Sequence, residues 1–193
     1  MQSDERTDAA QALVVIDMQK DFFRDPELGR CQADLTKACN TLIQRARDAG
    51  VPVFEVRTLH TADGSTWSIN MREDGEGIVI EGTEGAEPVD GLDISGATQV
   101  YKTRDSAFHR TELELMLTER HISSFALCGV STESCIALTA ADAYARDMRV
   151  TFVEEGVASV DPELNRQVLA NLTTQYRLPL LPLRDVRFVP AEG

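Results

Sequence analysis

Three residues of this chain supply the chemical groups that acyl transfer requires. Cys135 carries a thiol, Asp17 a carboxylate and Lys102 an ammonium group. A thiolate can attack a carbonyl carbon, and a partly desolvated carboxylate can take up a proton and return it. A neighbouring lysine can stabilise the thiolate and orient the carboxylate. The residue types therefore permit nucleophilic acyl transfer, provided that the fold brings together three positions far apart in the chain.

Cys135 lies where a strand is expected to pass into a helix. The apolar run 124–128 is followed by the segment 129–135, which reads GVSTESC and enters an alanine-rich stretch. A hydroxyl of Ser131 or Thr132 is expected to cap this helix, which puts Cys135 in its first turn. There the helix dipole favours a thiolate, and free backbone N–H groups are available to an oxyanion. A small buried packing residue is the alternative, and position alone does not separate the two.

Asp17 and Lys102 also follow apolar runs. Asp17 ends the run 12–16, and Lys102 follows Val100 and Tyr101. Taken singly, an aspartate at such a place is commonly a turn or capping residue, and a lysine is commonly solvated. Ligands of open α/β sheets bind outside the carboxyl ends of the strands. Three suitable residues at three such ends therefore favour one shared site.

Apolar runs alternate with helical patterns along the chain, which is typical of a parallel sheet covered by helices on both faces. We expect strands over 12–16, 51–56, 98–101, 124–128 and 149–153, and an edge strand over 186–189. Helices are expected over 35–49, 111–120 and 133–147, and from Asp161–Pro162 onward. We expect one domain over residues 1–193, with a flexible start at 1–10. Residues 59–97 lack periodicity, so we expect a long loop near the active site.

Composition excludes several classes of function. The chain has 193 residues and a net charge of -13, which argues against nucleic acid or an anionic membrane as the main partner. No apolar run approaches the roughly 20 residues of a membrane span. The polar N-terminus is unlike a signal peptide, and the four irregularly spaced cysteines are unlike a disulfide framework. The expected location is the reducing cytoplasm.

Three ordered motifs carry a family resemblance. Residues 12–22 read ALVVIDMQKDF, residues 101–108 read YKTRDSAF, and residues 128–136 read CGVSTESCI. Together they resemble the isochorismatase-like cysteine hydrolase superfamily, over about residues 11–180. That superfamily includes nicotinamidases, N-carbamoylsarcosine amidohydrolase, and ureidoacrylate and biuret hydrolases. Its relatives often show an acidic and a small residue opening a turn where Glu155 and Gly156 stand here.

The resemblance implies a three-layer, Rossmann-like fold with a six-stranded, mostly parallel sheet. It implies Asp17 as proton acceptor, Lys102 as its electrostatic partner and Cys135 as nucleophile. It also implies a cis peptide bond between Val130 and Ser131. This bond would aim the Ser131 N–H into an oxyanion hole, beside the N–H of Cys135. The implied reaction cleaves the C–N bond of a small amide, ureide or lactam through a thioester. Relatives of this kind are homo-oligomers, dimers or tetramers, that often complete the pocket from a neighbour.

The resemblance departs from nicotinamidases at their metal site. Those enzymes carry an Asp-x-His element after the second strand, whereas here His60 is preceded two positions earlier by Thr58. His60 and the displaced Asp63 fall short of the three protein ligands that such a site needs. We therefore expect no metal and no other cofactor.

Aromatic residues and alternative functions complete the prediction. Phe22, Trp67 and Phe108 are candidates for the pocket wall, although an aromatic residue is more commonly part of the core. Cys31, Cys39 and Cys128 are expected to pack in the core.

Two functions are alternatives to amide hydrolysis: an isochorismatase-type vinyl ether hydrolase and a catalytically idle binding or assembly protein. A flavodoxin-like nucleotide binder is disfavoured because no glycine-rich phosphate motif follows a strand.

Overall fold

A six-stranded sheet forms the centre of the molecule. The computed structural model describes residues 9–191. The strands follow the order β3-β2-β1-β4-β5-β6, and each neighbouring pair runs parallel. They are β1 (Leu13–Ile16), β2 (Val53–Thr58), β3 (Thr98–Lys102), β4 (Ser124–Val130), β5 (Arg149–Ala158) and β6 (Leu180–Leu181). The α/β sheet that the sequence predicts is confirmed.

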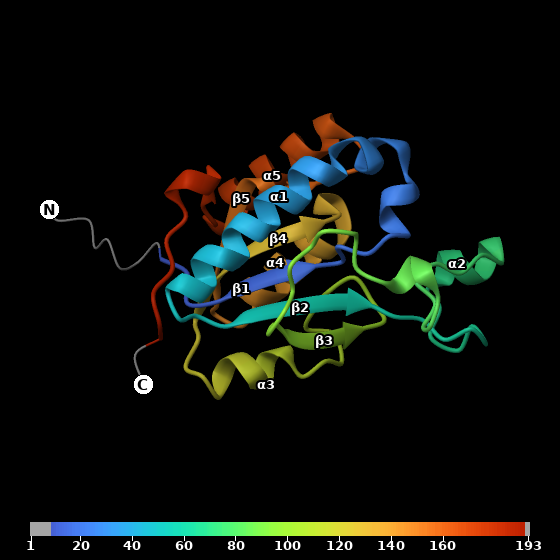
Figure 1. The fold of residues 1–193 in the computed structure, drawn as a ribbon, viewed down its shortest axis with the longest axis horizontal. Coiled ribbons are helices and arrows are strands. Elements are labelled where there is room, and N and C mark those ends of the chain that lie inside the picture. The colour runs from blue at the N-terminus through green and yellow to red at the C-terminus, as the bar shows by residue number, and fades with distance from the viewer. Residues whose placement is uncertain (1–8, 192–193) are drawn as a thin grey trace, which may run out of the picture.

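Helices cover both faces of this sheet, so its central strands are apolar on both sides. The covering helices are α1 (Pro26–Asp48), α3 (Leu113–Thr118), α4 (Ala137–Tyr144) and α5 (Pro162–Tyr176), and the short α2 (Ile69–Asp74) lies apart from them. One core packs α1 against the sheet, and the other packs α3, α4 and α5 against the opposite face. Figure 1 shows α1 running across the sheet and α2 lying beyond the edge toward which the strands point. Within residues 9–191, no helix is long and apolar enough to cross a membrane.

The first helix begins earlier than its apolar pattern predicts. Asp25 caps it by accepting hydrogen bonds from the N–H groups of Glu27 and Leu28, and Pro26 occupies the first turn. Proline is favoured there because its missing N–H would have no helical partner. The same pairing of an aspartate cap with a proline starts α5 at Asp161, as predicted.

Two strand predictions need correction. The sixth strand is Leu180–Leu181 rather than 186–189, where Phe188 forms an isolated bridge to Ala10. Prolines 179 and 182 flank β6 and restrict it to two residues, which conceals it in the sequence. Glu155 and Gly156 do not open a turn, because β5 continues through an irregular register to Ala158.

The structure bears on the predictions made for the N-terminal residues and for the cysteines. Of the residues 1–10 expected to be flexible, 1–8 lie outside the described residues, while Ala9 and Ala10 are buried. All four cysteines are described and free, and Cys39 and Cys128 are fully buried in the core beneath α1, as predicted. Cys31 packs only partly against that core.

The long segment 59–97 contains α2 and is fastened to the sheet. The Asp21 carboxylate accepts a hydrogen bond from the Val79 N–H at 2.7 Å, and the Gln19 side chain donates to the Ala86 carbonyl at 2.9 Å. Any side chain at Gly85 would collide with Asp21, at 2.0 Å from its carboxylate oxygen. These contacts hold the segment against the turn that follows β1.

Gly129 sets the distance between β4 and β1 just before the nucleophile. Its φ is +116°, and a Cβ atom there would lie 1.9 Å from the carbonyl oxygen of Ile16. Shortly after Gly129, the peptide bond between Val130 and Ser131 is cis, as the resemblance implies. Glycine is therefore needed where the chain turns from the sheet toward Cys135.

We expect Gly129→Ala to lower the free energy of unfolding by about 3 kcal/mol or more, because a backbone atom occupies the place of the new methyl group. Urea denaturation followed by circular dichroism measures this loss. Gly75→Ala is the matched control: its φ is +70° and its Cβ meets nothing within 4 Å. It should cost about 1–2 kcal/mol, and equal losses for the two variants would contradict the steric argument.

Candidate active site

The three predicted residues meet at the carboxyl edge of the sheet. Asp17 directly follows β1, Lys102 ends β3, and Cys135 lies in the π-helical turn Thr132–Ile136 between β4 and α4. Asp17 adopts φ +53°, and its N–H donates to the carbonyl of Val56 on β2. The fold thus brings Lys102 next to Asp17, 85 residues before it, and next to Cys135, 33 residues after it.

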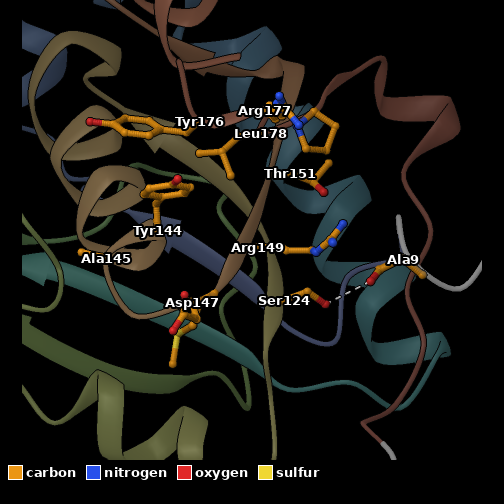
Figure 2. Close-up of a pocket in the computed structure, with 12 residues that line it drawn as sticks. Ala9, Ser124, Tyr144, Ala145, Asp147, Arg149, Thr151, Tyr176, Arg177 and Leu178 are labelled. Carbon is orange, nitrogen blue, oxygen red and sulfur yellow. Dashed lines mark hydrogen bonds between the residues drawn. The ribbon is translucent and has the colours of Figure 1, made fainter. Parts of the chain in front are cut away.

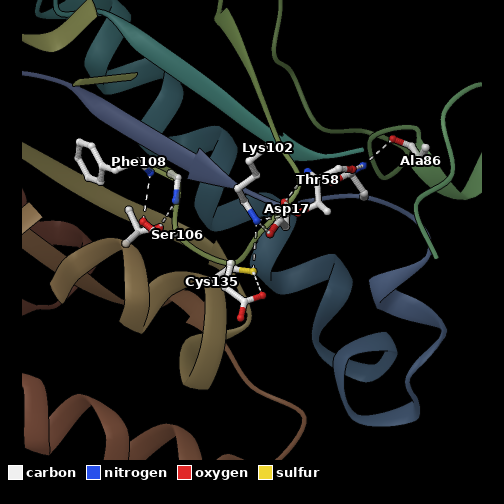
Figure 3. A network of polar contacts seen from close by, with 11 residues as sticks. Asp17, Thr58, Ala86, Lys102, Ser106, Phe108 and Cys135 are labelled. Carbon is white, nitrogen blue, oxygen red and sulfur yellow. Dashed lines mark hydrogen bonds and ion pairs between the residues drawn. The ribbon is translucent and has the colours of Figure 1, made fainter. Parts of the chain in front are cut away.

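Lys102 connects the other two residues. Its Nζ donates to Asp17 Oδ2 at 2.7 Å and lies 3.3 Å from Cys135 Sγ, as Figure 3 shows. The side chains of Asp17 and Lys102 are both completely buried. A buried ion pair is maintained only when its remaining polar atoms are also satisfied.

Thr58 satisfies those atoms, and sequence reasoning missed it. Its hydroxyl accepts from Lys102 Nζ at 2.6 Å and donates to Asp17 Oδ1 at 2.9 Å, and its N–H also donates to Oδ1. Thr58 ends β2 in register with Lys102 on β3. Its place at the carboxyl end of a strand was the signal that could have identified it.

Gln19 is the second missed residue. It is fully buried, its Oε1 accepts from the Thr58 N–H at 3.0 Å, and its Nε2 donates to the Thr58 carbonyl at 2.8 Å. The side chain therefore holds the backbone of Thr58 on both sides. Asp17 and Gln19 are two positions apart in a tight turn, in which the Gln19 N–H donates to the Asp17 carbonyl. The sequence does not show this conformation, so it does not show that both side chains reach Thr58.

The electrostatics differ from the sequence prediction of a thiolate. Burial raises the pKa of the Cys135 thiol, the charge of Asp17 raises it further, and Lys102 opposes both. Burial disfavours the charged form of Lys102, but Asp17 and Cys135 outweigh it and the pKa of the ammonium group is raised. The resting site therefore holds a neutral thiol beside a charged lysine.

The helix cap also differs from the prediction. Neither Ser131 nor Thr132 caps the helix with its hydroxyl, and the Thr132 hydroxyl donates instead to the carbonyl of Ala158 at 3.1 Å. The first turn is widened to a π-helical turn, in which the Ile136 N–H reaches the Ser131 carbonyl. Ser131 directly precedes this turn and Cys135 lies within it, and their roles in an oxyanion hole stay predictions.

The predicted aromatic residues are placed in three different surroundings. Phe108 is buried in the core with its ring 6.4 Å from that of Phe125. Phe22 packs partly against the core beneath α1. Trp67 is half-buried, and its indole N–H donates to the carbonyl of Thr61 at 2.9 Å. Their contact with substrate stays a prediction, with the packing of Phe108 favouring a core role.

The donor set for a nicotinamidase-type metal does not fit. The Thr58 hydroxyl lies between Asp17 and Lys102, and the His60 Nδ1 faces the Thr66 hydroxyl at 3.2 Å. Asp63 accepts from Thr61 and Ser65. Within residues 9–191, His, Cys, Asp and Glu side chains form no group of three that could hold a metal ion.

Two cavities lie at different edges of the sheet. One of about 370 Å³ lies between the segment after β3 and α4, and it is lined by Arg104, Asp105, Ser106, His109, Leu138, Ala141 and Asp142. The other, of about 680 Å³, lies where β4 and β5 begin and includes the neighbouring rings of Tyr144 and Tyr176, whose planes are tilted by 36° (Figure 2). The larger cavity is at the edge opposite Cys135, whereas the smaller one reaches the site through Asp105, whose carboxylate lies 3.9 Å from Cys135 Sγ.

Comparison with known proteins identifies the family. The Isochorismatase domain model matches residues 11–180. A probable inactive nicotinamidase of Arabidopsis thaliana is 34% identical over 163 residues, which cover 80% of this chain and 83% of that protein. This chain belongs to the isochorismatase family. Family members are hydrolases, including nicotinamidases and amidases.

Solved structures of the isochorismatase family agree with this fold. An isochorismatase family protein from Desulfovibrio vulgaris superposes with a TM-score of 0.80 at 32% identity, covering 91% of this chain and 95% of that one. N-carbamoylsarcosine amidase from Thermoplasma acidophilum superposes with a TM-score of 0.77 at 26% identity, covering 91% and 97%. The predicted superfamily is thereby confirmed.

We expect Thr58→Val to lower the free energy of unfolding by about 1–3 kcal/mol, because it removes one hydrogen bond from each member of a buried ion pair. Chemical denaturation at neutral pH measures the change. Thr41→Val is the control, since its exposed hydroxyl bonds only the Lys37 carbonyl within α1, and it should stay within about 0.5 kcal/mol of the parent. Equal effects would show that Thr58 does not support the pair.

The raised pKa of Cys135 predicts slow alkylation without substrate. Iodoacetamide should label Cys135 more slowly at pH 7 than it labels an unfolded thiol, and the rate should keep increasing above about pH 9, because the thiolate is the reactive form. Mass spectrometry of the labelled peptide over a pH series measures this. Lys102→Met should slow labelling further, since Lys102 lowers the thiol pKa. A rate that levels off below pH 8 would contradict this electrostatic picture.

Proposed function

We propose that this protein is a cysteine hydrolase that cleaves the C–N bond of a small amide, ureide or lactam. The observation that carries the proposal is the contact of Lys102 Nζ with both Asp17, at 2.7 Å, and Cys135 Sγ, at 3.3 Å. Nucleophile, cation and carboxylate in mutual reach are the components of nucleophilic catalysis. Support also comes from the amidase and nicotinamidase relatives.

In the proposed reaction, Asp17 takes the proton from the Cys135 thiol as sulfur attacks the carbonyl carbon. The N–H groups of Ser131 and Cys135 receive the negative charge that develops on the carbonyl oxygen. Asp17 then passes the proton to the leaving nitrogen, which departs as ammonia or an amine and leaves a thioester on Cys135. Water attacks the thioester, giving a carboxylic acid and restoring the thiol.

Lys102 keeps its charge throughout this sequence. Its raised pKa suits a group that compensates negative charge rather than one that transfers protons. When the thiol proton moves to Asp17, negative charge passes from the carboxylate to sulfur, and Lys102 contacts both atoms. The ammonium group therefore stabilises the site before and after the transfer.

A panel of small primary amides and ureides, assayed for released ammonia, tests the proposal. Cys135→Ala should lower turnover by about a thousandfold or more, because the covalent path is lost. Cys31→Ala, which changes a thiol on α1 away from the site, is the control. An acyl adduct on Cys135, detected by mass spectrometry after rapid quenching, should accompany turnover.

Two other outcomes favour the alternative functions. Turnover of isochorismate that Cys135→Ala leaves intact would replace the proposal by an ether hydrolase. Absence of turnover over the whole panel would favour an idle family member, as the name of the Arabidopsis thaliana relative states for that protein. The small-molecule partner and a homo-oligomeric state stay predictions, and light scattering measures the latter.

A further inference from the structure

Asp105 places a second carboxylate against the nucleophile. Its Oδ1 lies 3.9 Å from Cys135 Sγ, and its side chain is otherwise exposed. The residue follows β3 by three positions, so it stands at the same edge as Lys102. The reaction proposed above uses Asp17 and assigns no role to Asp105.

Within residues 9–191 the Asp105 carboxylate has no cationic partner within ion-pair distance. The neighbouring Arg104 directs its guanidinium group to the carbonyls of Thr66 and Thr103 instead. The only described hydrogen-bond contact of the carboxylate is the Cys135 thiol. The carboxylate is therefore an uncompensated negative charge in the lining of the 370 Å³ cavity.

Such a charge impedes the reaction while the cavity is empty, because it opposes formation of a thiolate at Cys135. A cation bound between the two groups removes this opposition, since it neutralises the carboxylate and attracts electrons on sulfur. Of the other walls, Leu138 provides an apolar surface, whereas the Asp142 carboxylate is already occupied by the Ser106 hydroxyl and by Arg146, 3.8 Å away. Asp105 is therefore the carboxylate of this cavity that is open to a ligand. The volume of about 370 Å³ is in the range of small-molecule pockets.

We propose that Asp105 is a specificity-determining residue that selects amides bearing an ammonium or guanidinium group close to the scissile carbonyl. This inference rests on the proposed amide hydrolysis and names its substrate class. Neutral amides of the same shape bind without neutralising Asp105, and anionic ones are repelled by it. Selection and activation of the nucleophile are then achieved by the same ion pair.

Matched substrate pairs test the proposal. A series of ω-amino amides, beginning with β-alaninamide, is compared with alkyl amides in which a methyl group replaces the ammonium, beginning with butanamide. The parent enzyme should show kcat/KM about tenfold or more higher for the cationic member at the best chain length, in keeping with a hydrogen bond between charged groups. Asp105→Asn should bring this ratio close to one.

Asp147→Asn is the matched control. Asp147 is exposed at the opposite edge of the sheet, beside the larger cavity, and asparagine tolerates its φ of +57°. It removes the same charge from the protein, so its ratio of cationic to neutral turnover should equal that of the parent. A ratio that falls equally in both variants would attribute the preference to net charge and overturn the role of Asp105.

A binding measurement separates this inference from the proposed function. Saturation-transfer NMR with n-butylammonium reports occupation of the cavity without turnover, and n-pentanol serves as the neutral probe. Binding to the parent and to Asp147→Asn, but not to Asp105→Asn, supports cation recognition even if no amide is hydrolysed. Efficient hydrolysis of neutral amides with no cationic preference would overturn the inference and leave the amidase function standing.

Discussion

The buried ion pair between Asp17 and Lys102 is the constraint on which the rest of the site depends. Removing two charges from water costs several kcal/mol for each ion, and only close and complete pairing offsets that cost. Here the ammonium group has three partners, and the carboxylate accepts from both the N–H and the hydroxyl of Thr58. Strands β1, β2 and β3 must therefore keep their register for the charges to stay buried.

The segment 59–97 is best understood as part of this support. It is anchored through Gln19 and Asp21, which follow Asp17 at alternate positions in the same turn. Gln19 holds the backbone of Thr58 and the carbonyl of Ala86 at once. A displacement of segment 59–97 would therefore be transmitted toward the ion pair through its hydrogen bonds to Gln19 and Asp21. The segment itself contains none of Asp17, Lys102 and Cys135.

Without a ligand, the surroundings of Cys135 favour the neutral thiol over the thiolate. Burial and the carboxylate of Asp17 raise the thiol pKa, while Lys102 lowers it, so the balance of charge around sulfur decides when a thiolate forms. A ligand that excludes water or adds positive charge changes this balance at the moment of binding. A thiol held in this form is less open to alkylation and oxidation than a thiolate would be.

The sequence by itself determined the α/β class, most strands and helices, the family and the three central residues. Apolar runs ending in Asp17 and Lys102, and the glycine-containing turn before Cys135, are local signals that need no knowledge of distant contacts. Only the tertiary structure decided the roles of Thr58 and Gln19, because an uncharged side chain at a strand end gains its importance from the ions beside it. The protonation of Cys135 was likewise beyond the sequence: the helix position favours a thiolate, but burial and neighbouring carboxylates prevail, and both arise from segments that meet only in the folded chain.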